Sequence, residues 1–236
     1  MDSINKKIFP LTIMFVICAV LIGGITWIVA DEGKAPEAEL TKVEESLPAP
    51  LTAEALKAYD VDITNNVNPI AVLKTNKGTI EIELFEDWMP ITAGNFAKLA
   101  EEGFYNGTQF HRVIEGFMIQ GGDPNTKTDN ALSYGTGGPG YAIKDEHIKA
   151  DLLTNVRGTI SMANSGPDSG GSQFFINLVD NTNLDFDKPP FTSKHPVFGR
   201  VVEGMEVVDA IGQVETNQRD LPTDPIVVES VAIRRN

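Results

Sequence analysis

The segment that most constrains the fold covers residues 110–123 and reads FHRVIEGFMIQGGD. It predicts a short strand, a tight turn at its Glu-Gly pair, a second short strand, and a glycine pair that ends it. Strand alternation places Phe110 and Arg112 on one face, and Met118 and Gln120 together on a face of the second strand. A core strand would not carry Arg112, and a surface strand would not carry Met118. The segment therefore predicts a small surface that combines a cation, an amide and apolar side chains.

A second segment, residues 158–176, repeats this mixture and reads GTISMANSGPDSGGSQFFI. It predicts a strand, a wide polar loop and a returning strand. Alternation puts Gln173 and Phe175 on one face and Phe174 and Ile176 on the other. A lone phenylalanine is more often a core residue. The pairing of Phe175 with a polar neighbour, as around Arg112, indicates a site.

These two segments resemble the two signatures of the cyclophilin-type peptidyl-prolyl isomerases. The likeness extends over residues 68–236. It implies a mostly β fold: an eight-stranded antiparallel β-barrel capped by two helices. Hydrophobic periodicity and turn residues place several elements independently. The predicted elements are a hairpin of residues 70–75 and 79–85, a helix of residues 90–103, a second helix of residues 204–211, and a last strand of residues 226–233.

The resemblance implies catalysis of rotation about X-Pro peptide bonds, with no covalent intermediate, metal or cofactor. A site speeds this rotation by favouring the twisted amide over both planar forms. Arg112 is the catalytic candidate, because its guanidinium stays charged and would donate to the proline nitrogen. Alternation supports the placement of Arg112, Gln120, Gln173 and Phe175 independently. The substrate-binding candidates are Phe117, Met118, Gln120, Ala163, Asn164, Gln173, Phe175, Leu184 and His195.

The chain departs from the family pattern after residue 180. An aromatic residue usually precedes the leucine that matches Leu184, and here that position is Asn183. The segment 185–194 then intervenes before His195. Because the missing aromatic contributes to cyclosporin binding in the family, we expect weak inhibition. We expect the longer loop to affect substrate choice.

Three other motifs suggest different chemistry. The glycine-rich residues 134–141 lack the Lys-Ser/Thr pair of a phosphate-binding loop, so they predict an irregular turn. Asp168-Ser169-Gly170-Gly171 resembles a serine-protease nucleophile loop, but no histidine stands in the usual context for a base. The acidic and amide residues from Asn181 to Asp187 resemble a calcium loop that lacks its glycine and its bidentate glutamate. A hydrolase and a metal site are therefore minor alternatives.

The N-terminal part of the chain predicts a membrane anchor. Residues 1–7 form a short polar start, and residues 8–30 give 23 uncharged residues, enough to cross a bilayer as a helix. Lysines before this run and acids after it favour a cytoplasmic N-terminus and an extracytoplasmic domain. A cleaved signal peptide, giving a secreted or periplasmic protein, is the alternative. Residues 31–67 predict a flexible acidic linker to the domain of residues 68–236.

Composition limits the partners. The net charge of −14 and the pI near 4.6 argue against nucleic acid, which requires basic surfaces. The single cysteine, Cys18, lies in the apolar run, so the domain depends on no disulfide. The expected partners are proline-containing peptides or unfolded client proteins, and we expect a monomer. A catalytically weak module that binds proline-containing segments is the alternative function.

Overall fold

The computed structural model describes residues 68–192 and 194–235. The predicted membrane segment, residues 8–30, and the predicted linker, residues 31–67, lie outside the described residues. Within the described part of the chain, no helix combines the length and the apolar character that a membrane crossing requires.

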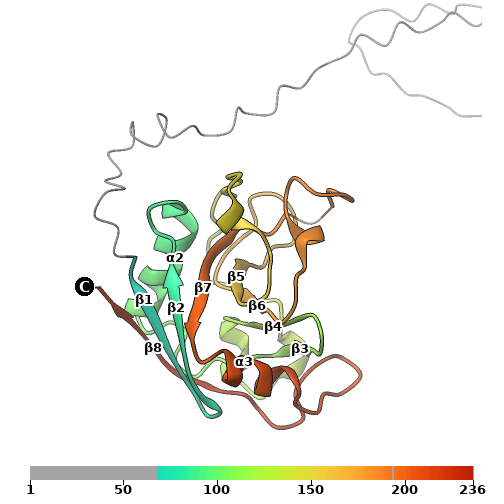
Figure 1. The fold of residues 1–236 in the computed structure, drawn as a ribbon. Helices are drawn as coiled ribbons and strands as arrows, with labels where there is room; N and C mark the ends of the chain where they lie inside the picture. The colour runs from blue at the N-terminus through green and yellow to red at the C-terminus, as the bar shows by residue number, and fades with distance from the viewer. Residues whose placement is uncertain (1–67, 193, 236) are drawn as a thin grey trace, which may run out of the picture. The chain divides into compact units, whose positions relative to one another are not determined.

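Eight strands form one sheet in which every neighbouring pair is antiparallel, in the order β3-β4-β6-β5-β7-β2-β1-β8. The sheet curls into a half-barrel (Figure 1). This confirms the predicted mostly β, cyclophilin-like architecture of eight antiparallel strands, but the sheet is an open half-barrel with β3 and β8 at its edges, not the predicted barrel. The strands are β1 (Ile70–Thr75), β2 (Gly78–Leu84), β3 (Arg112–Ile114), β4 (Met118–Gly121), β5 (Thr159–Met162), β6 (Phe174–Asn177), β7 (Val197–Glu203) and β8 (Val228–Arg234).

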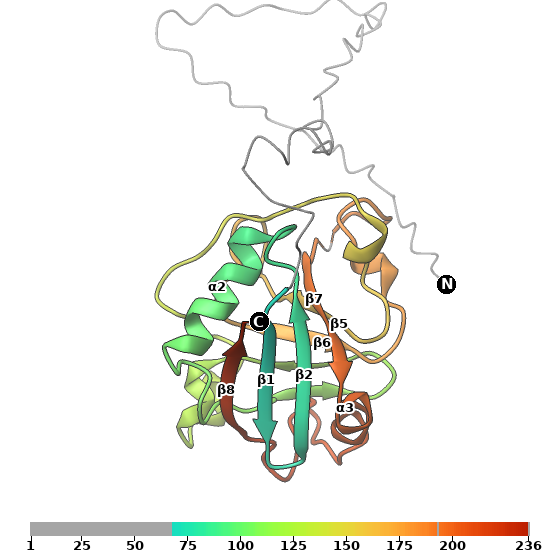
Figure 2. The same cartoon turned by 60° about the vertical axis from the view of Figure 1, so that its left-hand side comes forward.

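The β1–β2 hairpin shows how the alternating pattern forms this sheet. Ile80, Ile82 and Leu84 are buried on one face of β2, while the intervening glutamates face outward. Glu81 pairs with an arginine of β8, and Glu83 pairs with an arginine of β7, at distances of 2.7 and 2.8 Å. Figure 2 shows β8, β1 and β2 side by side at the front. The predicted hairpin is therefore confirmed.

Among the residues that the structure describes, two α-helices cover the sheet, as predicted. They are α2 (Pro90–Glu101) and α3 (Met205–Gly212). Helix α2 lies beside β8 (Figure 2) and buries Ala93, Phe96 and Ala97. Its N-terminus has no side-chain cap of its own, but the carboxylate of Glu146 accepts hydrogen bonds from the amides of residues 91 and 92. A carboxylate at this end is stabilised by the helix dipole.

Phe110 does not share a face with Arg112, contrary to the prediction. Strand β3 begins only at Arg112, so the alternation does not extend back to Phe110. The amide of Phe110 donates to the carbonyl of Ile226, and its ring packs edge-on against Phe174 in the main core. Strand β8 begins at Val228, two residues later than the predicted start at Ile226.

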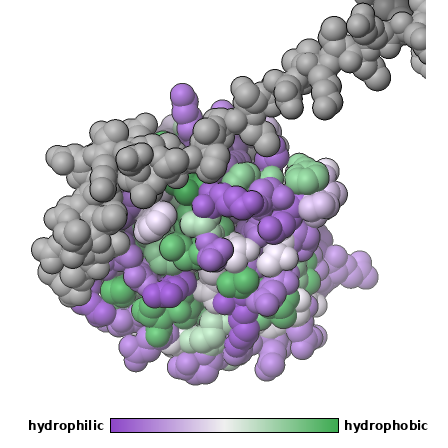
Figure 3. Space-filling model, turned by 45° about the horizontal axis from the view of Figure 1, so that its top comes forward, coloured by the Kyte–Doolittle hydropathy of each residue, from purple (hydrophilic) through white to green (hydrophobic). Residues whose placement is uncertain are grey.

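The apolar side chains form two separate clusters. The main core fills the inside of the curled sheet and includes the stacked rings of Phe96 and Tyr105. A second cluster of Met118, Phe175 and Leu184 lies apart from it. Where Figure 3 shows this face in colour, hydrophobic side chains occur in groups between hydrophilic ones. The second cluster is therefore the feature that needs a functional explanation.

Candidate functional site

The register of three strands aligns the polar and aromatic candidates. Strand β4 lies between β3 and β6, and it pairs Gln120 with Arg112 on one side and with Phe175 on the other. Directly opposed residues of antiparallel strands point to the same face. The structure therefore brings Arg112, Gln120 and Phe175 into one row across the sheet.

The second cluster forms an apolar slot beside this row. Met118, Phe175 and Leu184 are each less than a tenth exposed and contact one another. The partly buried side chains of Ile114, Phe117 and Ala163 pack around them. Ile114 was not a predicted site residue, although it lies two positions from Arg112 on the same face of β3.

His195 lies at the edge of the slot. Its ring meets the ring of Phe175 edge-on, with centroids 5.3 Å apart. Its Nδ1 lies 3.0 Å from the carbonyl oxygen of Met162, so this nitrogen carries the proton and donates it. Burial is the main cause that lowers the pKa of His195, and the Met162 carbonyl opposes the shift. The imidazole is therefore neutral at pH 7.

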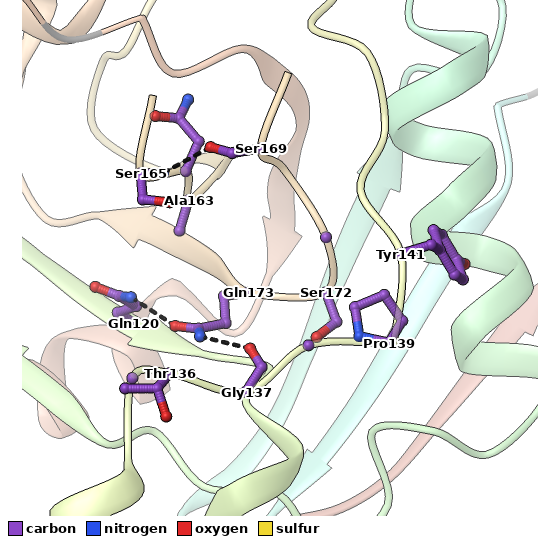
Figure 4. A pocket seen from close by; sticks show the side chains of 14 residues that line it. Gln120, Thr136, Gly137, Pro139, Tyr141, Ala163, Ser165, Ser169, Ser172 and Gln173 are labelled. Atoms are coloured by element: carbon purple, nitrogen blue, oxygen red, sulfur yellow. Dashed lines mark hydrogen bonds between the residues drawn. The ribbon is translucent and has the colours of Figure 1, made fainter. Parts of the chain in front are cut away.

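Amide side chains line the other side of the row. Gln120 Nε2 donates to Gln173 Oε1 at 3.0 Å, and Gln173 Nε2 donates to the carbonyl of Gly137 at 2.8 Å (Figure 4). Asn164 Nδ2 donates to the carbonyl of Lys194 at 2.9 Å. Within residues 68–192 and 194–235, the Ala163 carbonyl and the Asn164 amide N–H have no hydrogen-bond partner. This short edge of backbone is available to a bound peptide.

A pocket of about 450 Å³ adjoins these amides. Figure 4 shows it between the glycine-rich loop that carries Thr136 and Gly137 and the loop that carries Ala163 and Ser169. The glycine-rich loop is held by the buried carboxylate of Asp123, which accepts from the amides of residues 135 and 137. A Cβ on Gly137 would lie 2.1 Å from Asp123 Oδ1, so only glycine fits there. The irregular turn predicted for residues 134–141 is thus one wall of the pocket.

Arg112 lies at the rim, and its side chain is 44% exposed. Its Nε is 3.6 Å from Asp220 Oδ2. Asp220 is fixed beside it because the amide of Val113 donates to the Asp220 carbonyl at 2.8 Å. Sequence analysis missed Asp220, which lies in a loop about a hundred residues further along the chain and belongs to no motif.

Comparison with known proteins agrees with this geometry. A model of the family described as "Cyclophilin type peptidyl-prolyl cis-trans isomerase/CLD" matches residues 70–233, which is more than half of the chain. The chain is a cyclophilin-type peptidyl-prolyl cis-trans isomerase.

Two curated relatives and one solved structure show the extent of the likeness. "Peptidyl-prolyl cis-trans isomerase-like 1" of Mus musculus is 42% identical over 164 residues, which are 68% of this chain and 89% of the relative. A "Peptidyl-prolyl cis-trans isomerase" of Acinetobacter baylyi is 44% identical over 172 residues, covering 71% and 86% of the two chains. The crystal structure of a Cryptosporidium parvum cyclophilin-type isomerase superimposes with a TM-score of 0.61 at 31% identity, covering 72% and 99%. The same Cryptosporidium protein was also solved in the presence of the dipeptide Ala-Pro.

The slot of this cyclophilin is supported by a buried carboxylate that sequence analysis did not identify. Asp185 accepts hydrogen bonds from the Thr154 hydroxyl and, at 2.8 Å each, from the backbone N–H and the side-chain amide of Asn155. The side-chain amide of Asn155 also donates to the carbonyl of His195 at 3.1 Å. The backbone N–H of His195 donates to the carbonyl of Leu184. These bonds hold Leu184 and His195 in place from outside the slot.

A second set of buried amides supports the opposite wall. Asn155 Oδ1 accepts from Ser161 Oγ at 2.7 Å and from Asn177 Nδ2 at 3.2 Å. Asn181 Nδ2 in turn donates to Asn177 Oδ1 at 2.8 Å and to the carbonyl of Phe117 at 2.9 Å. Since buried amides left without partners are costly, this network constrains the backbone of Phe117.

The loop that distinguishes this chain packs against a neighbouring segment. Asn183 is exposed on a short 3-10 helix, Thr182–Leu184. Further along, the ring of Phe186 stacks on His147 at 5.1 Å, and Asp187 pairs with Lys149 at 3.4 Å. The first half of the longer loop is therefore held against residues 147–149.

The alternative chemistries find no support in the described residues. Ser169 Oγ donates to the carbonyl of Gly166 and accepts from the amide of Ser165, and no histidine nitrogen within residues 68–192 and 194–235 bonds to it. Across the same residues, no group of three or more His, Cys, Asp or Glu side chains is placed to hold a metal ion. Ser169 thus closes a turn in this structure.

The neutral state of His195 predicts how activity depends on pH. The pKa of a free histidine is about 6.5, and burial moves that of His195 below this value. Protonation therefore costs stability as the pH falls from about 6.5 through the folded-state pKa. Protonation of His195 also places a cation beside Phe175, in the wall of the slot. We expect kcat/KM of wild type to fall as the pH drops below about 6.5, and we expect it to change less in His195→Gln.

A His147→Gln variant is the matched control, since His147 is also partly buried but stacks on Phe186. Circular dichroism at each pH would verify that the proteins stay folded. If kcat/KM falls at low pH in the same way in wild type and His195→Gln, another group controls the pH dependence.

Proposed function

We propose that Arg112 is the catalytic residue and that the apolar slot receives the proline ring of a client segment. The observation that carries this proposal is the row of Arg112, Gln120 and Phe175 beside the slot. It combines a permanent hydrogen-bond donor, an orienting amide and an aromatic wall on one face.

The chemistry of the amide explains why these groups suffice. Planar X-Pro amides are separated by a barrier of about 18–20 kcal/mol, because rotation breaks the resonance of the C–N bond. In the twisted state the proline nitrogen regains a lone pair, which accepts a hydrogen bond. A donor at that position stabilises the twisted state more than either planar state, and this difference lowers the barrier. Arg112 is suited to this role because its guanidinium remains protonated.

The remaining candidates bind the substrate in this proposal. Phe117, Met118, Phe175 and Leu184 exclude water from the proline ring, and His195 lines the rim as a neutral group. The backbone of Ala163 and Asn164 offers an acceptor and a donor to the flanking peptide. Gln120 and Gln173 are mutually bonded and so are held in position to contact the same peptide.

The role of Arg112 predicts a loss of rate without loss of fold. We expect wild type to accelerate a proline-limited refolding reaction or the isomerisation of an X-Pro peptide. We expect Arg112→Ala to reduce kcat/KM by about 100-fold, the usual effect of removing one preorganised donor. Arg200→Gln is the matched control, because Arg200 is an exposed arginine that pairs with Glu83 on β2.

The two outcomes separate the alternatives. Equal activity of wild type and Arg112→Ala would remove the proposed role of Arg112. Binding of proline peptides by wild type without any acceleration would instead support a catalytically weak binding module.

Asn183 predicts the response to cyclosporin. We propose that the exposed Asn183 leaves the slot without the aromatic rim that the family uses for this ligand. Wild type should therefore be inhibited only weakly. Asn183→Trp should bind cyclosporin at least about tenfold more tightly, because a buried indole contributes well over 1.4 kcal/mol. Isothermal titration of the two proteins measures the difference, and nanomolar inhibition of wild type would refute the prediction.

We also propose that residues 8–30 anchor the chain in a membrane, so that the monomeric isomerase domain acts on exported, proline-containing clients. The support is the length of the uncharged run and the charges that flank it. The mass of the mature protein tests this. A mass that includes residues 1–30 in the membrane fraction is expected, and an N-terminus near residue 31 in a soluble fraction would indicate a cleaved signal instead.

A further inference from the structure

A second hollow, of about 250 Å³, adjoins the amide-lined pocket at Gln120. We call it the arginine hollow. Gln120 and Gly135 line both spaces, and Arg112 lines the hollow. The other lining residues that matter here are His111, Tyr134, Arg219 and Leu221. A peptide bound with its proline beside Arg112 would therefore pass the mouth of this hollow.

Two guanidinium groups face this hollow with little neutralisation. The guanidinium of Arg219 makes one hydrogen bond, of 3.4 Å to the carbonyl of Ala131, and within residues 68–192 and 194–235 it forms no ion pair. Arg112 has only the 3.6 Å contact with Asp220. The hollow is lined by two arginines, and Asp220 is the carboxylate that pairs with one of them. The hollow therefore has a local excess of positive charge, although the chain as a whole has a net charge of −14.

The other nearby carboxylate is already occupied. Asp123 is fully buried, and its oxygens accept three backbone N–H groups, those of Asn125, Gly135 and Gly137. It therefore fixes the loop and is not available to pair with an arginine. Its charge still acts on His111, where it opposes the effect of burial on the pKa.

His111 adds a buried polar group without a partner. It is only 5% exposed, and within the described residues neither ring nitrogen meets a partner at hydrogen-bond geometry. Both ring nitrogens are covered by protein, so His111 forms a wall of the hollow and leaves the ligand to the guanidinium groups. Because burial lowers the pKa of His111, the ring is neutral at pH 7 and carries one N–H donor.

We propose that the arginine hollow binds the side-chain carboxylate of an aspartate or glutamate that flanks the proline of a client segment. This inference rests on the proposed function, because it assumes that the proline lies beside Arg112. An extended peptide advances about 3.3–3.6 Å per residue, so a residue one or two positions from the proline reaches the hollow. The guanidinium of Arg219 can bind this carboxylate in a fork geometry that a lysine would not match, while the charge of Arg112 attracts the carboxylate and its donors stay on the proline nitrogen. The isomerase would then prefer proline segments with an acidic neighbour.

Matched peptides test this preference. Four pairs of proline peptides would carry glutamate or glutamine at one of the two positions on either side of the proline, with all other residues neutral. At one position, we expect kcat/KM of wild type to be about two- to five-fold higher for glutamate, the effect of a partly exposed ion pair. The preference should shrink in 1 M salt, where charges are screened beyond about 3 Å.

Two variants with opposite expected effects sharpen the test. In Arg219→Gln, the ratio of kcat/KM for the glutamate peptide to kcat/KM for the glutamine peptide should fall to about 1. Asp220→Asn should increase it, because it removes the competing carboxylate and asparagine tolerates the positive φ of 59° at this position. Arg200→Gln, which removes an equal charge outside the hollow, should leave the ratio unchanged.

The readout also separates this inference from the proposed function. If wild type accelerates the glutamine peptides but shows no glutamate preference at any position, the arginine hollow is not an acidic subsite. A preference that persists in Arg219→Gln would likewise overturn it. If wild type accelerates none of the peptides while it binds them, the proposed catalysis fails instead.

Discussion

The site depends on the register of β4 between its two neighbours. Gln120 is paired with both Arg112 and Phe175, so one backbone alignment decides which side chains share the face. A slip of one residue would turn Gln120 inward and bring Ile119, a core residue, to the surface. The burial of Ile119 and Val113 against the main core prevents this slip. The same apolar contacts that stabilise the fold therefore position the cation and the amide of the site.

The slot itself is held by polar groups that lie beneath it. Asn155 bonds to Ser161, Asn177 and Asp185, and through them it connects the walls of the slot to one another. The cost of leaving any of these buried groups unpaired makes the arrangement cooperative, because displacing one wall exposes several donors and acceptors at once. An apolar cluster alone would permit rotamer changes, and the slot would then have no single geometry. The network explains how a small cluster of flexible side chains retains a defined geometry.

Much of the fold and the centre of the site could be predicted because both rest on local patterns. Alternation identified the hairpins and placed Gln120 and Phe175 correctly, since each pattern lies within one strand. The prediction for Phe110 was wrong because alternation says nothing about where a strand begins. Asp220 and Asp185 could not be found in this way, because each acts on residues 30 or more positions away and belongs to no periodic pattern. Asp185 in particular lies in a run of acidic and amide residues that resembles a calcium loop, whereas its carboxylate is satisfied by hydrogen bonds from Thr154 and Asn155.

The position of Arg112 at the rim follows from the cost of burying a charge. A guanidinium inside the apolar slot would need a close carboxylate partner, and that partner would consume the donors that the proline nitrogen requires. At the rim the side chain stays half exposed, and the long contact from Nε to Asp220 orients it while its terminal nitrogens have no partner in the described residues. The neutral His195 and the apolar wall then provide the dry side of the site without opposing that charge. The apolar slot and the charged rim are therefore separate. Although the chain is strongly acidic overall, the guanidinium of Arg112 keeps free donors at the point where the amide twists.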